Sequence, residues 1–254
     1  PPPVSETDGK LKMTLPRNVI IFGASGGIGS ALVDHYAAQP NVETLHAVAR
    51  RPLPERPGVQ NHRVDITDEA ALETLASQIR QSKVHPDLIV VATGILSDEN
   101  GLQPEKSYRQ QSVAAFEQIF AINTFAPAMI ARHFLGLMPR KSPATFAALS
   151  ARVGSISDNQ LGGWHAYRAS KAALNMLIRN YAIEMGRTHE QLICVGLHPG
   201  TVRTDLSDPF SKNVPEDKLF DPAQAAGYLA DVLAGLTPGD SGAVFDWAGK
   251  AIPA

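Results

Sequence analysis

The sequence predicts a single α/β domain built around a doubly wound parallel sheet. Its 254 residues suit one domain of this kind. Short β-branched runs alternate with longer helical patterns along the chain, which is typical of a parallel sheet covered by helices on both faces. Neither internal repeats nor low-complexity linkers divide the sequence. We therefore expect one domain over residues 16–254, preceded by a proline-rich, polar and flexible tail over residues 1–15.

Four short segments in the first half are predicted to be the first four strands, Val19–Phe22, Thr44–Ala49, Gln60–Val64 and Asp87–Ala92. The segment Ile28–Ala38 predicts a helix between the first two strands, because its apolar residues recur on one helical face. A further helix is expected to begin after Thr67 as its capping residue. Asp68 and Glu69 would then occupy its first turn, where the positive end of the helix dipole favours carboxylates.

The second half continues the alternation. It predicts strands at Thr145–Ser150, Leu192–Leu197 and Ala243–Asp246, and helices at Val113–Phe134, at Ala166–Met185 and from Asp221 and Pro222 onward. The stretch Ala114–Met138 is the most apolar in the chain, but Glu117, Asn123 and Arg132 interrupt it. We expect it to be a long, largely buried helix and expect no membrane partner.

Composition argues against several classes of protein. The formal net charge of −2 lacks the basic excess of nucleic-acid-binding proteins, so no nucleic acid partner is expected. The single cysteine, Cys194, rules out an intrachain disulfide and fits a small apolar position in its strand. The eight histidines do not cluster at ligand spacing, so no metal is expected. An apolar signal segment does not follow the N-terminal charges, and a cytoplasmic location is the default expectation.

A glycine-rich turn, Gly23-Ala24-Ser25-Gly26-Gly27-Ile28-Gly29, joins the first strand to the first helix. Glycine permits the sharp turn, and the missing Cβ lets a pyrophosphate approach the free N–H groups of the helix. This strand–turn–helix context predicts a Rossmann-like dinucleotide site that includes Gly23, Ser25, Gly27, Ile28 and Gly29. The simplest alternative is a plain tight turn.

Two other motifs overlap the same turn. A P-loop would need Lys and Ser or Thr after the last glycine, but Ser30 and Ala31 follow it, so this motif is excluded. The G-x-S-x-G pattern of a hydrolase nucleophile elbow is also present, with Ser25 as the nucleophile and His198 as a possible partner. It stands after the first strand, where nothing upstream supplies an oxyanion hole, so the hydrolase is the weaker alternative.

Tyr167 and Lys171 stand one helical turn apart and therefore share a face of their helix. A phenol near an ammonium can pass a proton to or from a carbonyl oxygen, because the positive charge favours the phenolate. Alone, this spacing is usually just an exposed helix face. Other residues occur with it in order: Ala92-Thr93-Gly94 after the fourth strand, Asn123 in the long helix, and Pro199-Gly200 after the sixth.

Together these residues resemble the short-chain dehydrogenase/reductase family, and Gly162-Gly163-Trp164 before Tyr167 resembles its C-factor and sniffer-type carbonyl reductases. The resemblance implies that Tyr167 is the general acid or base and that Lys171 binds the nicotinamide ribose and lowers the pKa of Tyr167. It implies that Asn123 holds a proton-relaying water. Cofactor contacts are implied for Ala92, Gly94, Ile66, Pro199, Gly200, Val202 and Thr204. Asp65 is implied to contact the adenine. It also implies a homodimer or homotetramer, and a substrate lid over Asp205–Lys218 with Phe210 as its apolar contact.

One position departs from the family pattern. The catalytic serine usually is the second residue of a Ser-Ser pair, but here the pair is Ser150-Ala151. We expect Ser150 or Ser155 to supply the hydroxyl, with Ser150 favoured because it is nearer the strand end.

The second strand predicts the cofactor. An acidic residue at its end would bind the ribose hydroxyls of NAD, but Arg50 and Arg51 stand there instead. Arg50 can bond a 2′-phosphate, which favours NADP(H). The sequence thus predicts an NADP(H)-dependent oxidoreductase acting on a small-molecule carbonyl or alcohol. The alternative is a regulatory protein that keeps the nucleotide fold but has little turnover, as Ala151 suggests.

Overall fold

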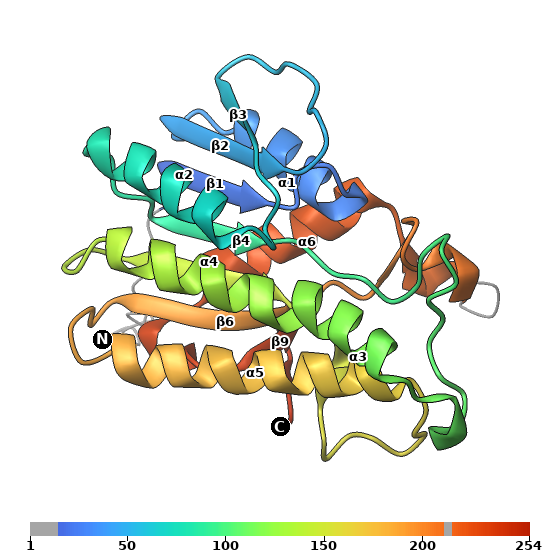
Figure 1. Cartoon of the computed structure of the whole chain (residues 1–254). Helices are drawn as coiled ribbons and strands as arrows, with labels where there is room; N and C mark the ends of the chain where they lie inside the picture. Colours follow the sequence, from blue (N-terminus) through green and yellow to red (C-terminus); the bar gives the residue numbers. More distant parts are fainter. Residues whose placement is uncertain (1–14, 211–214) are drawn as a thin grey trace, which may run out of the picture.

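The computed structural model describes residues 15–210 and 215–254 and confirms the predicted fold class. Eight strands form one sheet in the order β10-β9-β6-β5-β4-β1-β2-β3, and all neighbouring pairs are parallel except β9–β10. Helices cover both faces of this sheet (Figure 1). Except for Leu15, the predicted flexible tail lies outside the described residues, as do residues 211–214 of the predicted lid.

The first half follows the predicted boundaries within two residues. Its elements are β1 (Asn18–Phe22), α1 (Gly27–Ala37), β2 (Thr44–Ala49), β3 (Val59–Arg63), α2 (Glu69–Gln81) and β4 (Leu88–Val91). The predicted cap of α2 is wrong by one residue. Asp68 is the capping residue, because its side chain accepts a hydrogen bond from the Ala71 N–H, whereas Thr67 donates to Asp65.

The second half contains the predicted elements and several short ones. The longer elements are α3 (Val113–Phe120), η2 (Ala121–Phe125), α4 (Ala126–Phe134), β5 (Ala144–Leu149), α5 (His165–Met185), β6 (Leu192–His198), α6 (Pro222–Gly235) and β9 (Val244–Asp246). Single-turn 3₁₀ helices η1, η3, η4, η5, η6 and η7 occupy Tyr108–Gln110, Leu135–Leu137, Arg152–Gly154, Asp208–Phe210, Glu216–Lys218 and Pro238–Asp240. The unpredicted strands β7 (Thr201–Val202), β8 (Leu219–Phe220) and β10 (Ala251–Ile252) are too short for a periodic pattern.

The predicted long helix is present, with a π turn inside it, but it is not largely buried. A π-helical turn, η2, separates α3 from α4. The combined segment Val113–Leu137 is long and apolar enough to cross a membrane, by length and composition alone. The polar residues that interrupt it were expected to prevent this. Only 33% of its most apolar window is buried. In this fold the segment is part of a helical layer, since α4 contacts α2 and α3 contacts α5 (Figure 1).

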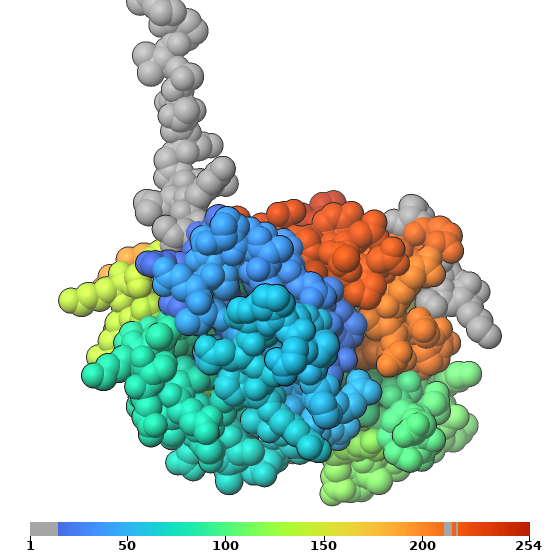
Figure 2. Space-filling model, turned by 90° about the horizontal axis from the view of Figure 1, so that it is seen from above, coloured from blue at the N-terminus to red at the C-terminus, as the bar shows by residue number. Residues whose placement is uncertain are grey.

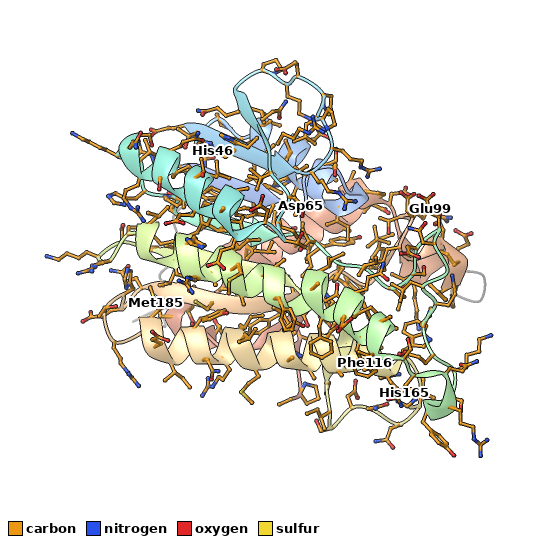
Figure 3. All side chains as sticks on the ribbon, in the orientation of Figure 1. His46, Asp65, Glu99, Phe116, His165 and Met185 are labelled. Atoms are coloured by element: carbon orange, nitrogen blue, oxygen red, sulfur yellow. The ribbon has the colours of Figure 1, made fainter. Side chains whose placement is uncertain are left out.

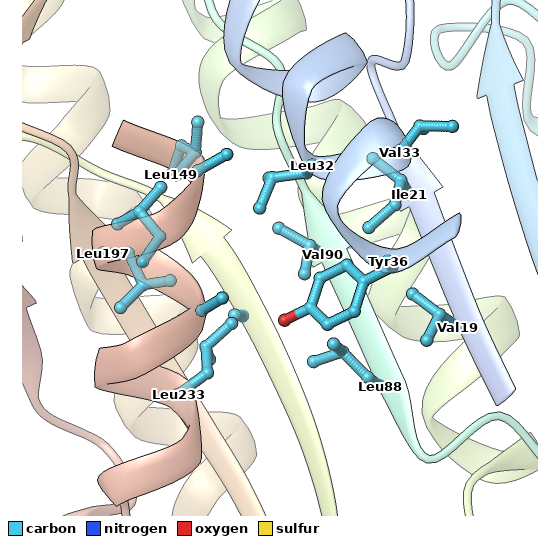
Figure 4. Packing of buried hydrophobic residues seen from close by; sticks show 14 of the residues in the cluster. Val19, Ile21, Leu32, Val33, Tyr36, Leu88, Val90, Leu149, Leu197 and Leu233 are labelled. Atoms are coloured by element: carbon cyan, nitrogen blue, oxygen red, sulfur yellow. The ribbon is translucent and has the colours of Figure 1, made fainter. Parts of the chain in front are cut away.

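Two apolar cores hold the helices to the sheet. One core places α1 and α6 on one face, where Leu32 and Tyr36 of α1 approach Val90 of β4 and Leu233 of α6 (Figure 4). The opposite core places α2, α4 and α5 on the other face. Seen from above, the blue surface of the N-terminal units adjoins the orange-red surface of the C-terminal part (Figure 2), consistent with the contact between α1 and α6.

The order of the strands fixes where a ligand can bind. The chain moves outward from β1 through β2 to β3, and then returns to β4 on the other side of β1. The connections after β1 and β4 therefore diverge at their carboxyl ends and leave a crevice between them.

Cys194 in β6 is fully buried, and burial raises the pKa of its thiol to about 12, as suits a small apolar core residue.

Candidate active site

The glycine turn after β1 packs too tightly for side chains. Gly23 has φ +81°, and a Cβ added to it would lie 2.7 Å from the Ala92 carbonyl oxygen. A Cβ on Gly29 would lie 2.1 Å from the Gly23 oxygen, and one on Gly27 would lie 2.7 Å from Thr204 Cγ2. The turn thus needs its glycines, and it exposes the N-terminus of α1 to the crevice.

Two cavities lie at this edge of the sheet and share a wall made by Gly26, Ala92, Thr93, Gly94 and Ile95. The inner cavity, of about 570 Å³, contains ten predicted site residues besides Ser150: Gly27, Ile28, Ala92, Gly94, Tyr167, Lys171, Pro199, Gly200, Val202 and Thr204. The outer cavity, of about 280 Å³, contains Gly23, Ser25, Arg50, Asp65 and Ile66 besides the shared wall. Gly29 and Asn123 line neither cavity. The two cavities form a continuous cradle, and its glycine wall and paired arginines fit a dinucleotide.

Asn123 links the wall of the cradle to α5. It lies in η2, is fully buried, and its amide accepts from the Ile95 N–H at 2.8 Å and donates to the Ile95 carbonyl at 2.9 Å. Its Nδ2 also donates to Ser170 Oγ at 3.2 Å, while Thr124 donates to the Ser170 carbonyl. The π turn thereby fixes the segment after β4 against α5, so the side chain has a structural role whether or not it also holds a water.

Tyr167 and Lys171 lie in the first turns of α5, near the His165 end labelled in Figure 3. Both are buried, and the Lys171 Nζ donates to the Leu149 carbonyl at 2.8 Å and lies 5.8 Å from the centre of the Tyr167 ring. A Cβ on Gly94 would lie 3.5 Å from Lys171 Nζ and 3.6 Å from Asn123 Oδ1. Gly94, Tyr167 and Lys171 therefore all line the inner cavity, with the Lys171 ammonium close to both of the others.

The pKa values of this pair differ from the expectation. Burial raises the pKa of Tyr167 to about 12 and lowers that of Lys171 to about 8. Desolvation of the phenolate therefore outweighs the attraction of the ammonium, which is held by a backbone carbonyl. In this structure the pKa of Tyr167 therefore lies above its ordinary value, and the phenol keeps its proton at neutral pH.

The predicted replacement for the family serine is not well placed as a proton donor. Ala151 lines the inner cavity and packs against Tyr167 and Leu96. The Ser150 hydroxyl donates to Asn175 Oδ1 on α5 at 2.6 Å, although Ser150 also lines the cavity. Ser155 lies outside the cavity lining, where its hydroxyl accepts from the Asp158 N–H. Side-chain alternation after β5 explains why Ala151 and Ser150 face different partners.

The outer cavity carries positive charge at the end of β2. Arg50 and Arg51 both line it, and Arg51 is a residue to which the sequence assigned no role. Asp65 stands across the cavity; hydrogen bonds from Thr67 lower the pKa of its carboxyl group, and Arg50 contributes to this shift. The ionised Asp65 follows β3, so the end of β2 itself presents only the two arginines.

Residues 17–215 match the short chain dehydrogenase family. The chain belongs to the short-chain dehydrogenase/reductase family. Members of this family are oxidoreductases that use a nicotinamide cofactor.

Three similar proteins refine the assignment. The 1-hydroxy-2-glutathionyl-2-methyl-3-butene dehydrogenase of Rhodococcus sp. (strain AD45) is 32% identical over 70% of this chain and 73% of its own length. C-signal of Myxococcus xanthus is 34% identical over 55% of this chain and 79% of its own length. The NADPH-bound carbonyl reductase from chicken fatty liver is 28% identical with a TM-score of 0.81, covering 96% of this chain and 100% of the other. C-signal and a carbonyl reductase are thus among the proteins that this chain is similar to, in agreement with the resemblance stated from the sequence.

The geometry of this short-chain dehydrogenase argues against the hydrolase alternative. A nucleophile elbow holds its serine in a strained turn, but the non-glycine residues with positive φ in residues 15–210 and 215–254 are Lys83 and Trp164, not Ser25. Ser25 and His198 also line different cavities.

Among the described residues, no group of three His, Cys, Asp or Glu side chains could hold a metal ion.

The structure adds residues to the inner cavity that the sequence did not single out for this role. His198 lies at the end of β6, and its burial and the charge of Arg152 lower its pKa to about 4, so it is neutral at pH 7. Leu206 and Ser97 also line the cavity. The one available signal was the position of His198 directly before the implied Pro199-Gly200 loop.

Proposed function

We propose that this protein is an NADPH-dependent carbonyl reductase. The observation that carries the proposal is that Tyr167, Lys171 and Gly94 line the same inner cavity, with the Lys171 ammonium close to the other two residues. A reacting carbonyl placed there would meet a proton donor at its oxygen. The cofactor, when bound, supplies the hydride to its carbon.

Tyr167 acts as the general acid in this proposal. Burial raises its pKa to about 12, so the phenol carries the proton that it donates to a ketone or aldehyde oxygen at neutral pH. Lys171 binds the nicotinamide ribose and supplies a positive charge beside the phenolate that forms. Asn123 and Ser170 hold the wall and the helix at a fixed separation, so the donor is preorganised.

The preference for NADPH rests on the outer cavity. Arg50 and Arg51 can bond a 2′-phosphate, whereas the end of β2 has no carboxylate for the ribose hydroxyls of NAD. The carbonyl reductase from chicken fatty liver contains bound NADPH in its crystal structure. The proposed substrate is a small organic carbonyl compound.

A regulatory protein with little turnover is the second candidate, because Ala151 removes the usual hydroxyl beside Tyr167. The assembled Tyr167, Lys171 and Asn123 favour an enzyme. Loss of one hydrogen bond to the developing oxyanion lowers turnover but does not abolish the proton donor.

The test is consumption of NADPH with a panel of aldehydes, ketones and quinones. Tyr167→Phe should lower kcat by about 10²- to 10⁴-fold while NADPH still binds, because only the proton is lost. Unchanged turnover in this variant would contradict the assignment of the acid. Absence of carbonyl reduction by the parent, with tight NADPH binding, would favour the regulatory protein.

Arg50→Ala and Arg51→Ala test the cofactor preference. Each should weaken NADPH binding by about 1.5–3 kcal/mol, the contribution of a hydrogen bond to a charged group, and leave NADH binding nearly unchanged. Titration of both nucleotides measures this difference. Equal losses for the two nucleotides would show that neither arginine contacts the phosphate.

A further inference from the structure

Trp164 occupies an unusual position beside the catalytic tyrosine. Its backbone has φ +51° and ψ +44°, the left-handed conformation, directly after Gly162 and Gly163, which also have positive φ. A bulky residue rarely adopts this conformation unless its surroundings hold it there. Here the Trp164 N–H donates to the Glu105 carbonyl at 2.6 Å, and the buried Glu105 carboxylate accepts from the Ala166 N–H at 3.3 Å.

The conformation places the indole between two spaces. On one side its ring lies 6.2 Å from the Tyr167 ring, edge to face, within the cluster that includes Ala151 and Leu206 of the inner cavity. On another side it lies 5.3 Å from Phe210. Trp164 and Phe210 both line a third cavity of about 790 Å³, here called the side cavity, which also contains Leu102, Glu105 and Gln118.

The volumes indicate how a substrate uses this arrangement. The inner cavity of about 570 Å³ must hold the reacting end of the cofactor as well as the carbonyl. Trp164 packs against Ala151 and Leu206 of the inner cavity and itself lines the side cavity, so a substituent that extends past the indole would find further room there. A rigid indole flanked by a phenyl ring offers edges and faces that an aromatic ring contacts better than an aliphatic ring of similar size.

We propose that Trp164 determines substrate specificity. Together with Phe210 it forms an aromatic partition between the inner and the side cavity. An aromatic ring of the substrate packs against this partition when the substrate extends from the inner into the side cavity. The inference rests on the proposed carbonyl reduction at Tyr167. The substrate class is then a ketone or aldehyde with an aromatic ring a short linker away from the carbonyl group. Glu105 is the positioning residue that holds the indole in place.

Three ketones with the same unactivated carbonyl group test this proposal: 4-phenylbutan-2-one, 4-cyclohexylbutan-2-one and butan-2-one. The parent should prefer the phenyl over the cyclohexyl compound by about 2- to 10-fold in kcat/KM, the advantage of an aromatic pair over equal apolar area. Trp164→Leu should bring this ratio close to one, and Trp164→Phe should retain part of it. Turnover of butan-2-one, which does not reach the partition, should change much less than the ratio.

Trp247→Phe is the matched control. Trp247 is the other of the two tryptophans in the chain and packs against Phe220 and Tyr228. This variant should keep the parent ratio of phenyl to cyclohexyl turnover. A ratio of one in the parent, or a ratio unaffected by Trp164→Leu and Trp164→Phe, would overturn the proposal.

A binding measurement separates this proposal from the proposed function. In Trp247→Phe, Trp164 is the remaining tryptophan, and with NADP⁺ present a ketone binds without turnover. The phenyl ketone should change the fluorescence of Trp164 at lower concentration than the cyclohexyl ketone. If this occurs while the parent reduces no carbonyl compound, the proposed function fails and the aromatic partition stands. If carbonyl compounds are reduced but neither ketone changes the fluorescence, the partition fails alone.

Discussion

Ala151→Ser restores a hydroxyl at the position where this chain departs from its family. Ala151 is only 8% exposed, its methyl group contacts Tyr167 and Leu96, and it lines the inner cavity. An added Oγ would therefore lie beside the phenol that donates to the carbonyl oxygen. It would supply a second hydrogen bond to the oxygen as negative charge develops there.

The size of the effect follows from the number of bonds gained. A hydrogen bond to a charged group contributes about 1.5–3 kcal/mol, and each 1.36 kcal/mol changes a rate about tenfold. Ala151→Ser should thus raise kcat for an unactivated ketone by roughly 10- to 150-fold. The gain should be smaller for a strongly electrophilic quinone, whose oxygen carries less charge in the transition state.

Ser150→Ala is the matched comparison. The Ser150 hydroxyl donates its proton to Asn175, so its removal should change kcat by less than about threefold, with a small loss of stability from the broken buried bond. The assay is steady-state NADPH consumption with one aliphatic ketone and one quinone. A loss of turnover of about 10²-fold or more in Ser150→Ala, together with no gain in Ala151→Ser, would refute the argument, because Ser150 would then be the oxyanion donor.

Two further predictions concern the pair of catalytic groups and the exposed helices. Burial lowers the pKa of Lys171 to about 8, whereas Tyr167 stays protonated. The value of kcat/KM for reduction should therefore fall by about tenfold per pH unit above pH 8, because the active ammonium form of Lys171 is lost. In Lys171→Met the rate should be lower and this decline absent, and a decline that persists in the variant would point to another group. Phe125, Met176 and Ile183 are at least half exposed on the α3–α5 layer, and we propose that a second copy covers them. Phe125→Glu should then reduce the molar mass in solution toward the 27.2 kDa of one chain, and an unchanged mass would exclude this face as the interface.

The sequence predicted the fold and the cradle because both depend on local patterns. Strand β4 is a continuous apolar run, and the glycine turn stands between a strand and a helix, so neither prediction needed tertiary information. The spacing of Tyr167 and Lys171 predicted that they share a helix face, whereas their roles were implied by the family resemblance of the whole set of motifs. Parallel strands then bring their carboxyl ends, and the residues after them, to one edge of the sheet.

Features that depend on tertiary packing were not predictable. The π turn at Ala121–Phe125 has no distinct composition, and the bonds of Asn123 to Ile95 and Ser170 join segments far apart in the chain. The raised pKa of Tyr167 results from burial, whereas the spacing to Lys171 alone predicts a lowered value. The left-handed Trp164 depends on Glu105, which no short-range pattern connects to it.

The sequence predicted both Gly29 and Gly94 as cofactor-binding glycines, but the structure gives them different roles. Gly29 is needed for folding, whereas we expect Gly94 to be needed for cofactor binding. A Cβ on Gly29 would lie 2.1 Å from the Gly23 oxygen, so Gly29→Ala must displace backbone and should lower the melting temperature clearly. A Cβ on Gly94 would meet its nearest atoms at 3.5 Å, an ordinary contact, so Gly94→Ala should fold with nearly parental stability. Its methyl group would nevertheless occupy the cradle between Lys171 and Asn123, and NADPH binding should weaken by tenfold or more, about 1.4 kcal/mol. Thermal melts and nucleotide titrations of the two variants measure this contrast. Normal NADPH affinity in Gly94→Ala would show that the cofactor does not pass over this wall, and the convergence of Tyr167 and Lys171 there would need another ligand.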